Sequence, residues 1–131
     1  MENTEKAQRN EALSPATLAQ FIGTETYTRH PLLPAVVMTD GVAHVYKHVG
    51  WPIDLMVVEQ LNPTMFGESF QHWTFDANKK TVICTDGNGK ILVDQALEYF
   101  DLGTDSLEFF IIEQLDLESR IAAVILLPSE Y

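Results

Sequence analysis

The apolar residues of this chain change their spacing near the middle, and that change limits the folds available to it. Before Asn62 they recur at intervals of three and four, as on one face of a helix. From Ser69 onward they alternate in short runs rich in β-branched and aromatic residues, at 69–77, 81–85, 90–100, 106–114 and 120–127. Helices followed by strands indicate an α+β domain. We predict N-terminal helices packed on a mostly antiparallel sheet of about five strands.

Three helices are predicted from capping and breaking residues. Ser14 suits an N-cap, Pro15 suits the first helical position, and Gly23 suits the end of that helix. The predicted helices cover 15–22, 42–49 and 51–61, with Thr39-Asp40 as the cap of the second. The short apolar run 35–38 could be a buried strand or the lead-in to a helix.

The sequence Asp86-Gly87-Asn88-Gly89 predicts a hairpin turn, because Asn-Gly is a strong turn signal. A calcium loop does not fit it. With Gly89 in the sixth position, the first and twelfth positions fall on Cys84 and Gln95, where acidic residues are required. The last predicted strand is apolar on both faces, so we expect it to be central or covered on both sides.

The length of 131 residues fits one domain. We expect a disordered leader over 1–12, since this stretch is polar and lacks a period, and a single α+β domain over 13–131. No apolar run is long enough to span a membrane, and the first residues do not resemble a secretion signal. Cys84 is the one cysteine, so no intrachain disulfide forms and a cytoplasmic location is the default expectation.

The net charge of −11 is concentrated near the C-terminus. Residues 91–131 carry nine carboxylate side chains and a single cation, Arg120. Direct binding to nucleic acid is disfavoured, because phosphate contacts require Lys and Arg. The acid could simply keep the protein soluble, or it could dock on a partner protein with a basic face. For the second reading the candidate partner-binding residues are Asp94, Glu98, Asp101 and Asp105.

The tract 23–31 places an acid, a phenol, a guanidinium and an imidazole close together. If the tract is extended, Glu25, Tyr27 and Arg29 point to one side and His30 to the other. Arg29 could then hold a ligand carboxylate or phosphate, with Glu25 or His30 carrying a proton. These four residues form the candidate ligand site. The alternative is an ion pair and a packed tyrosine beside a helix end.

The remaining candidates favour structural roles. His44 and His48 lie four apart on a predicted helix, but zinc needs three or four ligands, so we expect no metal and no cofactor. Cys84 has apolar neighbours that indicate an inert core thiol, and its position relative to His72 depends on a hairpin register that the sequence leaves open. Ser129 lacks the flanking glycines of a hydrolase nucleophile, so no catalytic residue is indicated.

The apolar C-terminus, 126–131, runs up to a proline near the chain end. Because chain ends fray unless tertiary contacts hold them, we expect Tyr131 to dock on the domain. Its ring should be packed, and its carboxylate should lie near a cation such as Arg29.

Several of these motifs together resemble one family. They are the opening Phe-x-Gly-Thr-Glu-x-Tyr-x-Arg-His of 21–30, Thr39-Asp40-Gly41-Val42, Asp86-Gly87-Asn88-Gly89 and the terminal Leu-Pro-Ser-Glu-Tyr of 127–131. The chain resembles, over 16–131, a family of small bacterial and phage-associated proteins known only as a domain of unknown function. The resemblance implies one compact domain in a cytoplasmic, bacterial setting, and it implies no activity. The helix after Gly50 and the stretch 113–120 depart from the family pattern.

Three functions follow as hypotheses. The first is a non-enzymatic accessory protein that binds another macromolecule through its acidic surface, and it draws on the skewed charge. The second is a small-molecule-binding protein or enzyme that uses Glu25, Arg29 and His30. The third is an acidic mimic of nucleic acid that serves a mobile element. Homodimerisation through sheet edges is also open.

Overall fold

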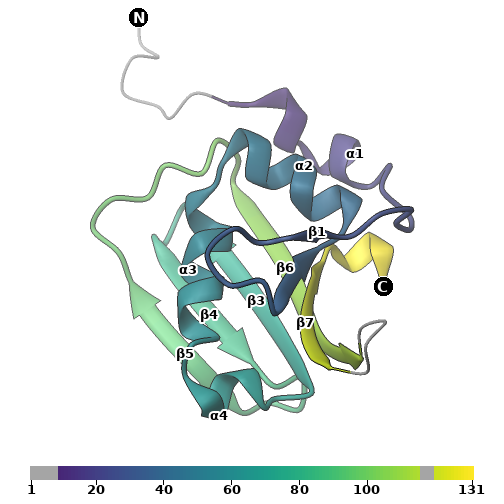
Figure 1. The fold of residues 1–131 in the computed structure, drawn as a ribbon. Coiled ribbons are helices and arrows are strands. Elements are labelled where there is room, and N and C mark those ends of the chain that lie inside the picture. Colours follow the sequence, from purple (N-terminus) through teal and green to yellow (C-terminus); the bar gives the residue numbers. More distant parts are fainter. Residues whose placement is uncertain (1–8, 116–119) are drawn as a thin grey trace, which may run out of the picture.

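The structure is a computed structural model that describes residues 9–115 and 120–131 (Figure 1). Its helices are η2 (Glu11–Leu13), α1 (Pro15–Leu18), α2 (Asp40–His48), α3 (Trp51–Glu59), α4 (Pro63–Phe66) and η3 (Pro128–Glu130). Its strands are β1 (Thr28–Arg29), β2 (Val36–Met38), β3 (Phe70–Asp76), β4 (Thr81–Thr85), β5 (Ile91–Ala96), β6 (Ser106–Leu115) and β7 (Ile121–Leu126). Residues 1–8 of the predicted leader and 116–119 of the last hairpin lie outside the described residues.

The strands form one sheet in the order β1-β2-β7-β6-β3-β4-β5, with α2 and α3 in front of it (Figure 1). Five of the six strand pairings are antiparallel, and β2 pairs with β7 in parallel. The α+β prediction is confirmed, but about five strands was too few. Of the two alternatives for 35–38, the buried strand is present as β2, and β1 lies within the tract predicted to be extended. Neither was counted in the predicted sheet, because strands of two and three residues are too short to show a period.

Alternate residues of the central strands face the helices. On β3, Trp73 and Phe75 are fully buried, whereas Phe70, His72 and Thr74 are partly exposed on the other face. β7 lies between β2 and β6, and its residues 122–126 are buried whichever way they point. The prediction of a central last strand is therefore confirmed.

The second and third predicted helices are present, and the first is wrong in length. The Thr39 side chain caps α2 by accepting a hydrogen bond from the Val42 amide. Ser14 caps α1 in the same way, but α1 ends after Leu18, well before Gly23. Four residues cannot bury an apolar stripe along two turns, so the spacing of Leu18, Phe21 and Ile22 mimicked a longer helix.

A buried network of amides joins α3 and α4 to β3. Gln60 and Gln71 are 3% and 1% exposed, and each donates to the side-chain oxygen of the other at 2.9 Å. Gln71 also donates to the Met65 carbonyl at 2.8 Å and accepts from the Trp73 indole at 2.9 Å. Buried amides cost little free energy when they are satisfied in this way. This pair was not predicted, since two glutamines eleven residues apart form no motif.

The turn at 86–89 has the predicted form. Gly87 and Gly89 have φ values of +84° and +96°, in the region that favours glycine. The Asp86 carboxylate accepts hydrogen bonds from the Asn88 and Lys90 amides, and these bonds lower the pKa of Asp86. The hairpin therefore sets the register of β4 against β5.

The N-terminal segment is attached to the connection between β5 and β6. The Asn10 amide donates to the Gly103 carbonyl at 2.8 Å, Arg9 pairs with Asp105 at 2.8 Å, and Leu13 is 1% exposed. Residues 9–13 thus lie against the domain. Within the described part of the chain, no helix is long and apolar enough to cross a membrane.

Candidate functional site

His30, Tyr46 and Asp54 form a hydrogen-bonded cluster contributed by β1, α2 and α3. His30 directly follows β1, and its Nε2 lies 2.8 Å from Oδ1 of Asp54. The Tyr46 hydroxyl donates to the same oxygen at 2.9 Å, and its ring meets the His30 ring edge to face at 5.4 Å. His30 is 1% exposed, whereas the Asp54 side chain is 44% exposed. The sequence predicted a role for His30 but for neither of its partners.

Both nitrogens of His30 are occupied within the fold. The Leu32 amide donates to Nδ1 at 3.1 Å, so Nδ1 is the acceptor and the neutral ring carries its proton on Nε2. That proton is donated to Asp54. A general base needs a lone pair directed at a substrate, and this ring offers none without breaking the bond to Leu32. The cluster therefore holds the 30–34 turn against α3.

The Asp54 carboxylate also changes the acidity of Tyr46. The hydrogen bond to Asp54, burial and the negative charge of that carboxylate together raise the pKa of Tyr46. Its hydroxyl stays protonated at neutral pH and acts as a donor, which is consistent with a positioning role.

The other residues of the predicted ligand site have separate contacts. The Glu25 amide donates to Asp40, Tyr27 is 52% exposed, and the Arg29 guanidinium donates to the Pro34 carbonyl at 2.8 Å. Only two residues of the tract, Thr28–Arg29, form a strand. Because the backbone bends at Glu25, the predicted extended conformation does not run through the whole tract, and these contacts do not direct the four side chains to one common partner.

The N-terminus of α2 receives the C-terminus of the chain. The Glu130 carboxylate accepts hydrogen bonds from the Thr39 hydroxyl at 2.6 Å, the Gly41 amide at 2.9 Å and the Leu127 amide at 2.9 Å. A Cβ atom on Gly41 would lie 2.6 Å from Leu127 Cδ1 and 2.8 Å from Glu130 Oε1, so only glycine fits there without displacement. The Thr-Asp-Gly and Leu-Pro-Ser-Glu-Tyr motifs are thus two sides of one contact.

The opening tract meets the same end of α2. The Thr24 hydroxyl accepts from the Asp40 amide at 2.8 Å and donates to the Thr26 carbonyl at 2.6 Å. The Asp40 carboxylate accepts from the Thr26 hydroxyl at 2.6 Å and from the Glu25 amide at 2.9 Å. These hydrogen bonds lower the pKa of Asp40, and the bond from Thr26 has the largest effect. We call this convergence of 24–26, 39–41 and 127–130 the α2 cap.

Tyr131 packs its ring on the sheet face that the helices leave uncovered. The ring meets Phe110 at 5.2 Å and Phe70 at 5.9 Å, both edge to face, while the residue remains 73% exposed. The expected docking of the ring is present. That its carboxylate lies near Arg29 stays a prediction.

The candidate partner-binding carboxylates lie along one continuous part of the chain, residues 94–105, which we call the acidic segment. Asp94 is on β5, and Glu98, Asp101 and Asp105 follow on the connection to β6. All four residues are exposed, and Asp105 is already paired with Arg9.

Two partly buried aromatic rings and one buried leucine hold the backbone of the acidic segment in place. The Trp51 indole donates to the Asp101 carbonyl at 2.8 Å and meets the Phe100 ring at 5.0 Å, and Leu102 is 1% exposed. Tyr99, by contrast, is 88% exposed. The segment therefore presents its carboxylates and one aromatic ring from a fixed backbone.

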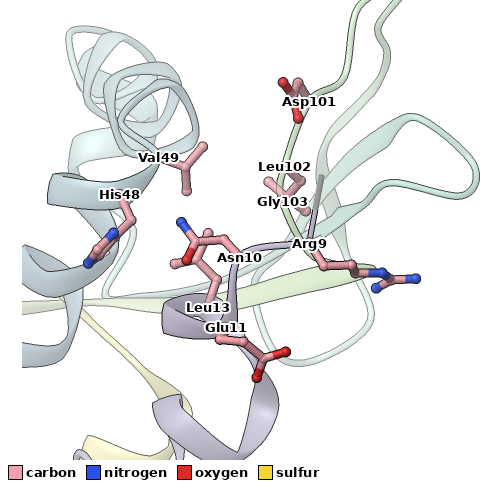
Figure 2. Close-up of a pocket in the computed structure, with 9 residues that line it drawn as sticks. All are labelled: Arg9, Asn10, Glu11, Leu13, His48, Val49, Asp101, Leu102 and Gly103. Atoms are coloured by element: carbon pink, nitrogen blue, oxygen red, sulfur yellow. The ribbon is translucent and has the colours of Figure 1, made fainter. Parts of the chain in front are cut away.

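A cavity of about 370 Å³ lies between the end of α2 and the acidic segment (Figure 2). Figure 2 shows Asn10, Leu13, Val49 and Leu102 around the gap, with the charged ends of Arg9 and Glu11 pointing away from it. The Asn10 side chain already accepts from the Ala12 amide at 3.0 Å. The cavity offers no convergent charges with which to hold an ionic ligand, and the sequence did not predict it.

The other sequence candidates have structural contacts. His44 donates from Nε2 to the Ala12 carbonyl at 2.8 Å, its ring lies 4.8 Å from that of His48, and Ser129 donates to the Leu18 carbonyl at 3.3 Å. Across 9–115 and 120–131, no group of three or more His, Cys, Asp or Glu residues could hold a metal ion.

The register of β3 and β4 separates Cys84 from His72. Cys84 pairs with Trp73, and His72 pairs with Thr85, so the thiol and the imidazole point to opposite faces of the sheet. Cys84 is fully buried, and burial, aided by the charges of Glu68 and Glu59, raises the pKa of its thiol to about 12. This thiol is not reactive at neutral pH.

Comparisons with known proteins give a family without an activity. Residues 12–131 match the family described as "Family of unknown function (DUF6876)", and the chain belongs to this family. The match includes the α2 cap, the His30 cluster and the acidic segment. No curated protein matches the chain, and no solved structure matches it.

Proposed function

We propose that this member of a family of unknown function is a non-enzymatic interaction protein that binds a protein partner with a basic face. The observation that carries the proposal is the acidic segment, in which four exposed carboxylates follow one another on a backbone anchored by Trp51 and Leu102. Opposite charges accelerate the encounter with a partner and select against partners of like charge. The exposed ring of Tyr99 adds the kind of aromatic contact that is enriched in interfaces.

The polar groups elsewhere support a binding role over catalysis. Both nitrogens of His30 and both carboxylate oxygens of Asp40 are engaged in hydrogen bonds within the fold. The thiol of Cys84, the one cysteine, is buried and unreactive, which fits a cytoplasmic protein. The acidic segment, in contrast, keeps carboxylates available to a partner.

The test compares two variants that each remove two negative charges. Asp94→Asn/Glu98→Gln neutralises two carboxylates of the acidic segment, and Glu68→Gln/Glu113→Gln neutralises one partly exposed and one exposed acid outside it. Each tagged protein is incubated with lysate of the source organism, and captured proteins are identified and quantified. We expect a stoichiometric partner on the wild type and on the control variant. Asp94→Asn/Glu98→Gln should not capture that partner. At high salt, neither the wild type nor the control variant should capture it.

Equal capture by both variants would show that the acidic segment is not the binding surface. Competition with double-stranded DNA separates the first hypothesis from the third. If DNA displaces the partner from the wild type, the partner's basic face is a nucleic-acid site and the protein acts as a nucleic-acid mimic.

A further inference from the structure

β5 is the last strand of the sheet, and one of its edges is unpaired among the described strands (Figure 1). The Leu97 amide donates to the Lys80 carbonyl at 2.9 Å, so these two residues continue the register of β4 and β5 as a hydrogen-bonded pair, next to the pair Thr81 and Ala96. Hydrogen-bonded and non-bonded pairs alternate along an antiparallel ladder. The main-chain N–H and C=O groups of Asp94 and Ala96 therefore point away from β4, towards the open edge.

The side chains around this edge combine negative charge with apolar surface. Asp94 is exposed on the strand, and Glu98 is exposed just after it. Ile91, at the beginning of β5, is 57% exposed, and Tyr99, beyond its end, is 88% exposed. The edge thus offers main-chain hydrogen bonds in its middle, apolar contacts near both ends and carboxylates beside them.

We propose that the open edge of β5 receives an extended, positively charged segment of the partner protein as an added strand. This inference rests on the proposed function and names the form of the partner. Main-chain hydrogen bonds give such a contact its affinity, and the side chains on either side give it specificity. Lys or Arg side chains of the added strand would lie beside Asp94 and Glu98.

Charge decides between a basic segment and a second copy of this chain. Pairing β5 with its own copy would bring Asp94 and Glu98 of one chain towards the same residues of the other, within a protein of net charge −11. Like charges placed across strands are destabilising. A basic segment removes that repulsion and replaces it with attraction.

The position of the main-chain groups allows a specific test. Ala96→Pro removes an N–H that points to the open edge and keeps the ladder to β4, because proline is tolerated on the outer side of an edge strand. Ala96→Val is the matched control, since it changes the side chain and keeps the N–H. Circular dichroism melting checks that both variants are folded.

The probe is a fluorescein-labelled hexapeptide of alternating lysine and valine, with a glutamate-valine hexapeptide as its counterpart. We expect the lysine peptide to bind the wild type and Ala96→Val with equal affinity in fluorescence anisotropy, and the glutamate peptide not to bind. Ala96→Pro should weaken binding by about tenfold or more, since it removes a main-chain donor and obstructs pairing. In NMR, the lysine peptide should slow hydrogen exchange at the Asp94 and Ala96 amides of the wild type.

Asp94→Asn/Glu98→Gln completes the test and has an independent prediction. It should weaken the binding of the lysine peptide and remove most of the dependence of that binding on salt. If the lysine peptide fails to bind Asp94→Asn/Glu98→Gln but binds Ala96→Pro fully, strand addition is overturned, and the acidic segment remains the binding surface. If the peptide fails to bind Ala96→Pro alone, the result supports strand addition and contradicts a role for the carboxylates of Asp94 and Glu98.

Two further results would overturn the inference. If neither peptide binds at millimolar concentration, the carboxylates and the β-bulge between Cys84 and Thr85 protect the edge against pairing instead. If light scattering shows a dimer that Ala96→Pro dissociates, the occupant of the edge is a second copy of this chain.

Discussion

The α2 cap and the acidic segment are both rich in polar side chains, and they use them in opposite ways. In the α2 cap, the Asp40 and Glu130 carboxylates together accept five hydrogen bonds from three segments of the chain. In the acidic segment, four exposed carboxylates follow one another, and Asp105 among them forms an ion pair with Arg9. Crowded polar groups in a sequence can thus serve the fold, whereas the carboxylates of Asp94 and Glu98 are exposed on the surface.

The difference has a simple electrostatic origin. The N-terminus of a helix presents unpaired amides and a partial positive charge, so carboxylates placed there are stabilised. Asp40 and Glu130 meet α2 at that end. Asp94 lies on an edge strand, where no such field acts on it. We expect changes in the α2 cap to alter stability and changes in the acidic segment to alter binding.

Deleting residues 128–131 should have the largest effect. It removes Glu130, which accepts two hydrogen bonds from the start of α2 and one from the Leu127 amide, together with the Tyr131 ring on Phe70 and Phe110. We expect the free energy of unfolding in urea to fall by about 3–5 kcal/mol, because charged hydrogen bonds contribute about 1.5–3 kcal/mol each. Tyr131→Ala separates the contribution of the ring. An unchanged unfolding midpoint would show that the C-terminus is not part of the cap.

Gly41→Val should have the next largest effect. Its side chain would meet Leu127 and Glu130 where even a Cβ atom is too close, so one side of the contact must shift. Overpacking of this kind costs about 1–3 kcal/mol, measurable by thermal or urea unfolding. Gly23→Ala is the control, since nothing lies within 4 Å of its Cβ position, and it should be nearly neutral or slightly stabilising. Equal loss in both variants would contradict the close approach at Gly41.

The lowered pKa of Asp40 makes part of the free energy of unfolding depend on pH in the acidic range. Its pKa in the folded protein is lowered from 3.8, so the folded state favours the ionised form. The corresponding stability is present above that value and is lost as the pH falls through the lower, folded pKa. Stability measured by urea unfolding between pH 5 and pH 2 should therefore fall less steeply in Asp40→Asn than in the wild type. An equally steep fall in Asp40→Asn and in the wild type would show that the hydrogen bonds to Asp40 do not stabilise the fold.

Asp94→Asn/Glu98→Gln should have the smallest effect on stability. Exposed substitutions away from caps and cores usually change the free energy of unfolding by less than about 0.5 kcal/mol. In the same sample, partner or peptide binding should fall. A stability loss of more than about 1 kcal/mol would place these carboxylates among the structural groups and remove the contrast with the α2 cap.

Local signals predicted much of the architecture. The period change located the five longer strands, the glycines of 86–89 gave the β4–β5 hairpin, and Thr39 gave the start of α2. Each of these depends on neighbours within a few residues. Whether 35–38 is a strand or the lead-in to a helix was not decidable in that way, because the parallel pairing of β2 with β7 joins residues far apart in the chain.

In the candidate site, too, some features were predictable from neighbouring residues and others depend on distant contacts. His30 attracted attention by its chemistry, but its role depends on Asp54, Tyr46 and the Leu32 amide, which the fold brings to it. The glutamines 60 and 71 carried no signal at all, since an amide pair is recognisable only once its partners are adjacent. The exposure of Asp94 and Glu98 agreed with expectation, because an isolated run of charge is seldom buried.

The sequence by itself determined the α+β class, the hairpin at 86–89, the burial expected of Cys84 and the acidic character of the C-terminal third. These follow from local periodicity, turn geometry and charge, which need no knowledge of distant contacts. Only the tertiary structure shows that the opening tract and the terminal Leu-Pro-Ser-Glu-Tyr both meet the start of α2, and that β5 is one of the two edge strands of the sheet. Contacts such as Glu130 with Thr39 join residues 91 positions apart, and no local pattern encodes which distant group will satisfy a given donor.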